Sequence, residues 1–342
     1  MKNLVFFLVI IFVIACKNSA VIINNEDSGK NVIPNPLKKD VIIAPFSKTI
    51  NNNLATSEEL REIVAYLASD ELKGRDIGSE GIEKAAVYIE NIFKQNNIET
   101  YFKTYRDSFN LKGVDAYNIV GFIEGNDENL KNEVIIIGAH YDHIGSAKQV
   151  GDDTIANGAN DNAAGTSGVL EIAEYFATTK NNKRSIMIAL FSAEEKGLKG
   201  SEHLAKKLKA ENIDLYIMLN FEMIGVPFKV RSYDAFLTGY DLSNMSAKIN
   251  EYTNSNLTGF SEVSKKYDLF KHSDNYAFYQ EFKLPCQTFS SCDLSNYDYY
   301  HHVDDEADKL DYSHMASLIN KIIPAIETMC NTPTKEIKMT NE

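Results

Sequence analysis

The stretch IGAHYDHIGSAKQVGDDTIANGAND, Ile137 to Asp161, decides the fold. It continues a wholly apolar, β-branched segment that starts at Val134, and such a segment suits a strand buried on both faces of a mainly parallel sheet. The apolar run stops at His140 and Asp142. Because open α/β sheets bind their ligands beyond the carboxyl ends of their strands, we expect this stretch to supply the first half of a metal site.

After this stretch, apolar residues alternate between helical and strand spacing. The pattern predicts, in order, a helix from about Gly165 to Thr178, a strand over Ser185–Phe191, a helix over Ser201–Leu208 and a strand over Leu215–Asn220. This alternation favours βαβ units. We therefore expect an α/β fold, a three-layer sandwich with a mixed, mostly parallel central sheet and helices on both faces.

The segment before the apolar run also has strand character. Asn118 to Glu124 predicts a strand, and Gly125-Asn126-Asp127 is a turn signal. We expect the strand over Val134–Ala139 to pair with it as a hairpin.

The N-terminus has the layout of an export signal. Lys2 supplies a positive start, Leu4 to Ile14 is apolar but too short to span a bilayer comfortably, and Ala15 precedes Cys16. The segment resembles the lipobox of bacterial lipoproteins, which implies a lipid on Cys16 and a protein held at the cell envelope, periplasmic or surface-facing. An ordinary signal peptide with an incidental cysteine is the alternative.

These features give a simple domain organisation. Residues 1–16 form the signal peptide, the Asn-, Lys- and Pro-containing residues 17–50 a flexible tether, residues 51–330 a single domain and residues 331–342 a tail. Export permits disulfides, so whether Cys286 and Cys292 are bonded stays open, and Cys330 is expected in the core of the last helix. The formal charge of −13 argues against a nucleic-acid-binding surface.

Metal-binding residue types follow several predicted strands in turn. Imidazoles and carboxylates without cysteine suit hydrolytic zinc, and this many carboxylates indicate two ions about 3.5 to 4 Å apart. The residues are His140, Asp142, Asp161, Glu194, Glu195, Glu222 and His301.

Five segments carry a specific resemblance. AHYDH, GANDNAAG, FSAEEKGLKGS, LNFEMIG and YHHVDDEADKLD stand in the order and approximate spacing of metallopeptidase family 28, the co-catalytic zinc aminopeptidases related to glutamate carboxypeptidase. The resemblance covers roughly Leu72 to the C-terminus. It implies the fold of the zinc aminopeptidases and a domain that hydrolyses peptide bonds.

The resemblance also implies roles. His140 and Glu222 would hold one zinc ion, Glu195 and His301 the other, and Asp161 would bridge them. Glu194 would be the general base for a water molecule activated by the two ions, since consecutive side chains in extended backbone point in opposite directions. Asp142 would accept the second ring N–H of His140 and fix its tautomer.

Some positions leave alternatives open. Glu222 stands where many relatives have Asp, so its longer side chain could change the metal spacing or leave it as a structural acid. His301 is favoured over His302 by the spacing to the downstream acids, and His143 is expected to be a loop or pocket-wall residue. Asp274, in His272-Ser273-Asp274, either lies near the substrate pocket or caps the next helix.

The sequence therefore predicts a secreted, membrane-anchored zinc aminopeptidase that acts on peptides with a free N-terminus. A glutaminyl cyclase with one zinc ion, which shares the fold, is the nearest alternative, and a non-catalytic binding ectodomain is a third. Residue preference, the distinction from dipeptidases and carboxypeptidases, and the oligomeric state are not determined by the sequence.

Overall fold

The computed structural model of the chain describes residues 54–340. The expected signal peptide, residues 1–16, and tether, residues 17–50, lie outside the described residues. Among the described helices, none is both long and apolar enough to cross a membrane.

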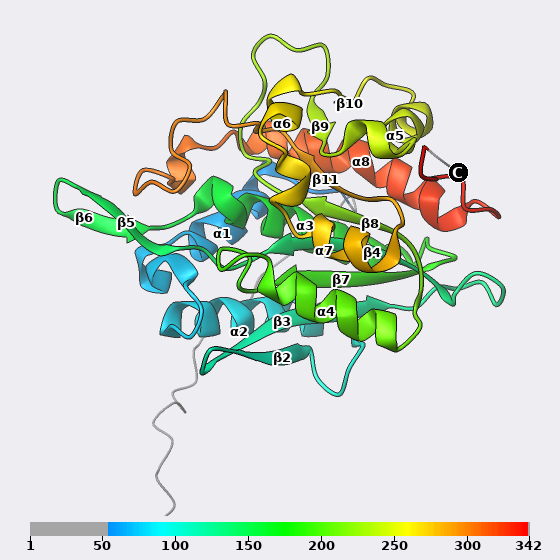
Figure 1. Cartoon of the computed structure of the whole chain (residues 1–342), viewed down its shortest axis with the longest axis horizontal. Helices are drawn as coiled ribbons and strands as arrows, with labels where there is room; N and C mark the ends of the chain where they lie inside the picture. The colour runs from blue at the N-terminus through cyan, green and yellow to red at the C-terminus, as the bar shows by residue number, and fades with distance from the viewer. Residues whose placement is uncertain (1–53, 341–342) are drawn as a thin grey trace, which may run out of the picture. The chain divides into compact units, whose positions relative to one another are not determined.

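The core of the domain is a nine-stranded mixed sheet with strand order β1-β3-β7-β4-β8-β11-β9-β10, in which β2 also pairs with β3 (Figure 1). The central strands β7, β4, β8 and β11 are mutually parallel, while β3 and β9 run antiparallel to their neighbours β7 and β11. The expected mixed α/β sandwich is confirmed. The strands are β1 (Glu99–Thr100), β2 (Arg106–Leu111), β3 (Val114–Ile123), β4 (Glu133–His140), β7 (Ser185–Phe191), β8 (Asp214–Phe221), β9 (Ala235–Leu237), β10 (Thr258–Gly259) and β11 (Cys286–Ser290).

The expected hairpin between β3 and β4 is wrong. β7 lies between these two strands, antiparallel to β3 and parallel to β4, with Ile186 paired to Ile123 on one side and Ile135 on the other. The physical reason is burial, because β4 is apolar from Val134 to Ala139 and gains one neighbour on each edge, β7 and β8, in the centre of the sheet. The true hairpin follows β4 and is formed by β5 (Gly145–Val150) and β6 (Asp153–Ala156), a pair outside the main sheet.

Helices cover both faces of the sheet. In Figure 1, α4 and α7 lie in front of the strands and α1, α3 and α8 behind them. Side chains of α4 and α7 share one apolar cluster with Ile136, Met187 and Met218 of the central strands. The helices are α1 (Ser57–Leu67), α2 (Glu80–Gln95), α3 (Gly165–Thr179), α4 (Lys199–Ala210), α5 (Met245–Thr253), α6 (Glu262–Lys266), α7 (Asn275–Phe282) and α8 (Tyr312–Asn331), with shorter turns η1 (Asp70–Arg75), η2 (Ala159–Ala164), η3 (Tyr240–Leu242), η4 (Leu269–Lys271) and η5 (Ala307–Lys309).

The segment after α8 packs on the domain. Ile337 is buried, and its amide N–H donates to the hydroxyl of Tyr216 at 2.8 Å. Ser243 forms an isolated bridge with Met339. The residues expected to form a tail therefore contact β8 and the start of α5 as far as Thr340, whose N–H donates to Leu242.

The three cysteines of the described residues are free thiols. Cys286, Cys292 and Cys330 are all buried and none is in a disulfide. Cys330 lies in α8 with no exposed surface, as expected for a core residue of the last helix.

Truncating a side chain in the middle of β4 should destabilise the domain. Ile136 has no exposed surface, so Ile136→Ala is expected to lower the free energy of unfolding by about 2–5 kcal/mol through lost burial and the cavity left behind. Urea denaturation monitored by circular dichroism measures the change. Val150→Ala, at a side chain that is 43% exposed, is the control and should change it by less than about 0.5 kcal/mol. Equal effects in the two variants would contradict the assignment of β4 to the core.

Candidate metal centre

The predicted site residues gather where parallel strands end. His140 is the last residue of β4, Glu222 follows β8 directly, and Glu194 and Glu195 come three and four residues after β7. Asp161 arrives from η2, at the start of the crossover through α3. Because β4, β7 and β8 are adjacent and parallel, their carboxyl ends open at the same edge of the sheet.

His140, Asp161 and Glu222 form a first donor group. One ligand atom from each lies within 4.8 Å of the others. The Nε2 atom of His140 stands 3.3 Å from Oδ1 of Asp161. This is the set expected for the first zinc ion.

The second group uses the other carboxylate oxygen of Asp161. His301 Nε2 lies 3.4 Å from Asp161 Oδ2 and 3.1 Å from Glu195 Oε2. His143 joins them, with its Nδ1 2.9 Å from Glu195 Oε1. Asp161 therefore stands between two groups of donors, which is the position required of a bridging carboxylate.

Several of these atoms have no hydrogen-bond partner. His140 Nε2, His301 Nε2, Glu195 Oε1 and both ring nitrogens of His143 are buried without a hydrogen bond. Buried polar atoms in proteins are almost always paired, so a cluster of unpaired imidazole and carboxylate atoms needs an explanation such as an ion. The residues present fit a zinc centre, because imidazole nitrogen and carboxylate oxygen are ligands that zinc accepts. Their role as ligands stays a prediction.

Asp142 is bound differently from the expectation. The Nδ1 N–H of His140 donates to the main-chain carbonyl of Asp142 at 3.2 Å, while the carboxylate stands off at 3.7 Å. The carboxylate instead accepts the backbone N–H groups of Glu194 at 3.2 Å and Glu195 at 3.4 Å. Asp142 thus orients His140 through its backbone and the adjacent glutamates through its side chain.

Asp305 performs the same task for the bridging residue. Its carboxylate accepts the backbone N–H of Asn160 at 2.8 Å and of Asp161 at 3.0 Å, and the hydroxyl of Tyr297 donates to it at 2.5 Å. The carboxylate is fully buried. These bonds fix the backbone from which Asp161 projects.

Of the two adjacent histidines, the structure brings His301 into the cluster. The His301 ring stacks on Tyr300, with ring centroids 3.9 Å apart. His302 turns away, and its Nδ1 accepts the backbone N–H of Asp304 at 3.1 Å. Asp274 is buried at the N-cap position of α7 but makes no capping hydrogen bond, so the capping expectation is not met. It does not line the pocket beside Glu222, although its charge acts on Glu194 and Glu222.

Charge governs the protonation of the cluster. Although burial opposes it, the carboxylates of Glu194, Asp142 and Asp161 raise the pKa of His140 well above its usual value. Asp161 and Glu195 likewise raise the pKa of His301 to about 10 against the effect of burial. Burial, reinforced by neighbouring carboxylates, raises the pKa of Glu194 well above its usual range and that of Glu222 to about 7.

A small pocket opens beside Glu222. Its lining is mostly apolar and hydroxylic, and comprises Glu222, Met223, Phe236, Thr238, Leu269, His272, Ser273, Thr288, Ser290, Cys292, Leu294 and Tyr300. The hydroxyls are engaged within the protein: Thr288 donates to Asn275 at 2.7 Å, and Ser273 donates to the carboxylate of Glu222.

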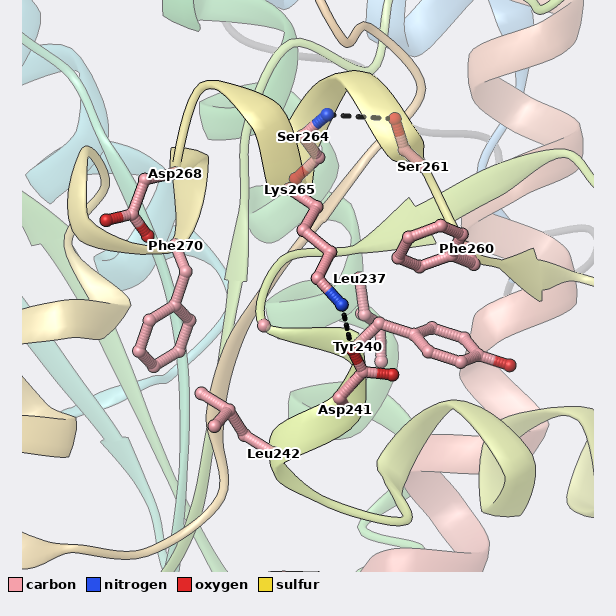
Figure 2. Close-up of a pocket in the computed structure, with 11 residues that line it drawn as sticks. Leu237, Tyr240, Asp241, Leu242, Phe260, Ser261, Ser264, Lys265, Asp268 and Phe270 are labelled. Atoms are coloured by element: carbon pink, nitrogen blue, oxygen red, sulfur yellow. Dashed lines mark hydrogen bonds and ion pairs between the residues drawn. The ribbon is translucent and has the colours of Figure 1, made fainter.

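A second hollow is lined by Leu237, Gly239, Tyr240 and residues of α6 and η4 (Figure 2). Leu237 faces it, whereas Phe236 and Thr238 line the pocket beside Glu222, as alternation along a strand requires. Figure 2 shows Lys265 reaching across to Asp241 at 2.8 Å. None of the predicted site residues lines this hollow.

Sequence reasoning missed two contributors to the cluster. His143 was expected in a loop or pocket wall, but it has no exposed surface and contacts Glu195. Asn162 is also buried, and its side chain accepts the backbone N–H of Met223 at 3.1 Å and donates to Phe221 at 3.0 Å, which ties the turn at Asp161 to the end of β8. Both lie next to predicted ligands, and their adjacency to His140–Asp142 and Asp161 was the available signal.

A mixed sheet with imidazole and carboxylate donors gathered beyond its carboxyl ends is the arrangement of a metal-dependent hydrolase of the α/β class. Within that class, the chain belongs to peptidase family M28, whose model matches residues 118–326, more than half of the chain. The family resemblance seen in the motifs is thereby confirmed.

Relatives agree with this family. A protein of Trichophyton verrucosum described as a probable leucine aminopeptidase is 25% identical over 225 residues, which are 64% of this chain and 57% of that protein. A probable zinc metalloprotease of Pyrenophora tritici-repentis is 33% identical over 112 residues, 33% of this chain and 25% of that protein. The matched region thus spans little more than half, or less, of these relatives.

Solved structures share the fold. The LapA aminopeptidase of Legionella pneumophila superposes with a TM-score of 0.60 at 22% identity, over 81% of this chain and 72% of that one. The glutaminyl cyclase of Porphyromonas gingivalis does so with a TM-score of 0.62 at 12% identity, over 82% of this chain and all of that one.

The pKa shifts predict how pH affects the metal-free protein. His140, His301, Glu194 and Glu222 all have pKa values raised by folding, so the folded state binds more protons than the unfolded state. The stability they contribute is greatest at low pH and is lost as pH rises through about 7 and then about 10. The lowered pKa values of Asp161 and Glu195 act in the opposite sense and only in acid.

We therefore expect the free energy of unfolding of chelator-treated protein to fall between pH 5 and pH 10 by at least about 1.4 kcal/mol, the equivalent of one pKa unit in one group. Urea titrations at several pH values measure it. His301→Ala should make the decline shallower, whereas the exposed control His272→Ala should not. A flat or rising profile in the unmutated protein would refute the charge assignment.

Proposed function

We propose that the chain is a zinc exopeptidase of the aminopeptidase type that binds two zinc ions. The observation that carries this proposal is the placement of Asp161, whose two carboxylate oxygens face separate donor groups. One group is His140 with Glu222, and the other is Glu195 with His143 and His301. Zinc bound there would polarise the scissile carbonyl and make water nucleophilic near neutral pH.

Glu194 is the proposed general base. It is adjacent to the ligand Glu195 but lies beside His140 and Glu222, whose charges act on its carboxyl group. Its backbone is fixed by Asp142, so the carboxylate is held at the edge of the donor cluster. From this position it would take a proton from the attacking water and deliver it to the leaving amine.

The pocket beside Glu222 is the proposed site for the side chain of the substrate's N-terminal residue. Apart from Glu222, which we assign to the metal, no acidic side chain and no Lys or Arg lines it. An uncharged, largely apolar side chain would fit this lining better than a charged one. The description of several relatives as leucine aminopeptidases supports the same preference.

A glutaminyl cyclase is the second candidate, because such enzymes share the fold. That reaction was expected to need one zinc ion. The second donor group, in which His301 and His143 approach Glu195, favours two ions and therefore the peptidase. A non-catalytic ectodomain is disfavoured, because all seven predicted positions carry functional side chains.

We also propose that the protein is exported and held at the bacterial envelope by a lipid on Cys16. The apolar segment before Ala15-Cys16 supports this proposal. The membrane would then be a partner of the N-terminus, and peptides with a free N-terminus the substrates of the domain.

Activity and metal content test the proposed function together. The protein should hydrolyse leucyl anilide faster than lysyl or aspartyl anilide, and it should leave peptides that begin with glutamine uncyclised. Elemental analysis should find two zinc ions per chain. A chelator should abolish hydrolysis and added zinc restore it. Asp161→Ala, which removes the shared acid, should lose both ions. Cyclisation with one ion per chain would favour the cyclase instead.

Removing the general base should separate chemistry from metal binding. Glu194→Gln keeps the size of the side chain but cannot accept a proton, so kcat is expected to fall by about 10²–10⁴-fold while zinc content stays unchanged. Steady-state kinetics and elemental analysis of the same preparation measure both. Glu128→Gln, whose side chain is 86% exposed, is the matched control. Full activity in Glu194→Gln would refute its role.

A further inference from the structure

Arg75 is a fully buried arginine whose guanidinium binds only main-chain carbonyls. Its Nε donates to Tyr141 at 2.9 Å, its Nη2 to Gly158 at 3.0 Å, and its Nη1 to Asn157 at 2.7 Å and to Leu67. Among the described residues, no carboxylate forms an ion pair with it. Because burying a charge is costly, a guanidinium that donates only to main-chain carbonyls indicates that the position of this backbone matters.

Three of these four carbonyls belong to the two turns beside the predicted metal ligands, and the fourth, that of Leu67, lies at the end of α1. Tyr141 stands between His140 and Asp142, and Asn157 and Gly158 lead into Asp161. These turns are joined through the β5–β6 hairpin, which projects from the domain in Figure 1 and whose residues are mostly exposed. Arg75 also closes the loop with its own carbonyl, which accepts the N–H of His143 at 3.4 Å. One residue therefore clamps both ends of the insertion between the first donor and the shared acid.

The backbone around Arg75 is shaped for this contact. Lys73, Gly74 and Arg75 have φ values of 47°, 68° and 48°, a left-handed run that is costly for the two residues with side chains. Gly74 lies so close to the base of the hairpin that a Cβ would stand 2.3 Å from the carbonyl oxygen of Ala156. The turn η1 is thus pressed against the hairpin, and this brings the guanidinium beneath the two ligand-bearing turns.

A second buried arginine, Arg184, shows which effects come from burying an arginine and which come from the position of Arg75 beside the site. Arg184 is the only other Arg or Lys buried among the described residues. It binds the carbonyls of Met329 and Thr332 at 3.0 and 2.6 Å and the carboxylate of Glu133 at 2.6 Å. Its neighbour Ser185 pairs with Val134, at the end of β4 remote from His140. Arg184 therefore fastens the chain far from the site and is a matched control.

We propose that Arg75 is a positioning residue of the metal centre, whose forked guanidinium sets the separation between the turn at His140 and the turn at Asp161. The inference rests on the proposed function, since it concerns the spacing of the zinc ligands. A lysine at this position would keep the charge but would offer a single nitrogen in place of a planar fork, and so could not hold both turns.

Charge alone predicts the opposite result. Arg75 lies close enough to Asp142, Asp305, Asp161 and Glu195 for their charges to act on it. If it served only as a countercharge, its removal would leave the site more negative and zinc would bind more tightly. If it positions the turns, both a neutral and a cationic replacement weaken binding.

The experiment compares Arg75→Lys, Arg75→Met and Arg184→Lys in the full-length protein. Zinc affinity is measured by competition with a chromophoric chelator after the metal has been stripped, and thermal unfolding of each metal-free protein identifies a temperature at which all are folded. Both Arg75 variants should bind zinc about 10–100-fold more weakly than the unmutated protein, the range found when residues that orient metal ligands are lost. Arg184→Lys should lower the melting temperature without changing zinc affinity. Added Co²⁺ should give an altered visible spectrum only in the Arg75 variants.

Three results would overturn the proposal. Unchanged zinc affinity in Arg75→Lys would show that the planar guanidinium is not needed. Tighter zinc binding in Arg75→Met would show a countercharge role, and equal weakening in Arg184→Lys would show a general effect of stability.

If the Arg75 variants do not fold, Asn157→Ala replaces them. The Asn157 amide holds the same turn by donating to Asp70 at 2.7 Å and Glu306 at 2.8 Å, so its loss should also weaken zinc binding, and unchanged affinity would reject the inference. Failure of the unmutated protein to bind zinc would instead refute the proposed function, and the inference with it.

Discussion

The mutual repulsion of carboxylates at one edge of the sheet is the constraint on which the site depends. Asp142, Asp161 and Asp305 are fully buried or nearly so, and Glu194, Glu195 and Glu222 stand beside them. Taking a carboxylate out of water costs several kcal/mol unless it gains a partner, and gathering several multiplies the cost. The cluster can persist only where imidazoles, backbone N–H groups or cations offset it. The pKa values of Glu194 and Glu222 are raised because burial and the neighbouring carboxylates penalise their charged forms by more than their partners in the protein offset.

The sheet brings the predicted metal ligands to one edge, and the hydrogen bonds of the turns fix their exact positions. Parallel pairing of β4 with β7 and β8 brings three strand ends together, and it needs only apolar, β-branched segments of the right length. Apart from His140, which ends β4, the donors sit on the turns beyond those ends, where backbone is free to take irregular conformations. Strand order therefore sets which residues meet, and local hydrogen bonds set how closely they meet.

This division explains how much the sequence could predict. Periodicity identified most strands and helices around the site, and the family resemblance of the five motifs pointed to the residues that the structure brings together, because both signals are recorded in neighbouring residues. The position of β7 between β3 and β4 is a long-range choice between two possible partners, and nothing within Asn118–Ala139 distinguishes them. His143 was undervalued for a related reason. Its approach to Glu195 depends on the turn that follows β4, and alternation along a strand gives no information once the strand has ended.

Two buried carboxylates hold the site in the same way, by accepting hydrogen bonds from two consecutive backbone N–H groups. Asp142 accepts the consecutive backbone N–H groups of Glu194 and Glu195, and Asp305 those of Asn160 and Asp161. In each case a buried acid is stabilised by amides rather than by a cation, and the amides belong to the residues that carry the donors. Charge-assisted bonds of this kind are short and directional, so they fix a turn more firmly than apolar packing does.

The device also leaves the donor side chains unencumbered. If Asp142 or Asp305 occupied the ring nitrogens that face the cluster, its carboxylate would compete with a metal for the same atoms. Because the clamps act on the main chain, the ring nitrogens of His140 and His301 that face the cluster keep no hydrogen-bond partner in the protein. Order in the backbone and availability of the side chains are thus obtained from the same contacts, and a site assembled from turns can be as well organised as one built on strands.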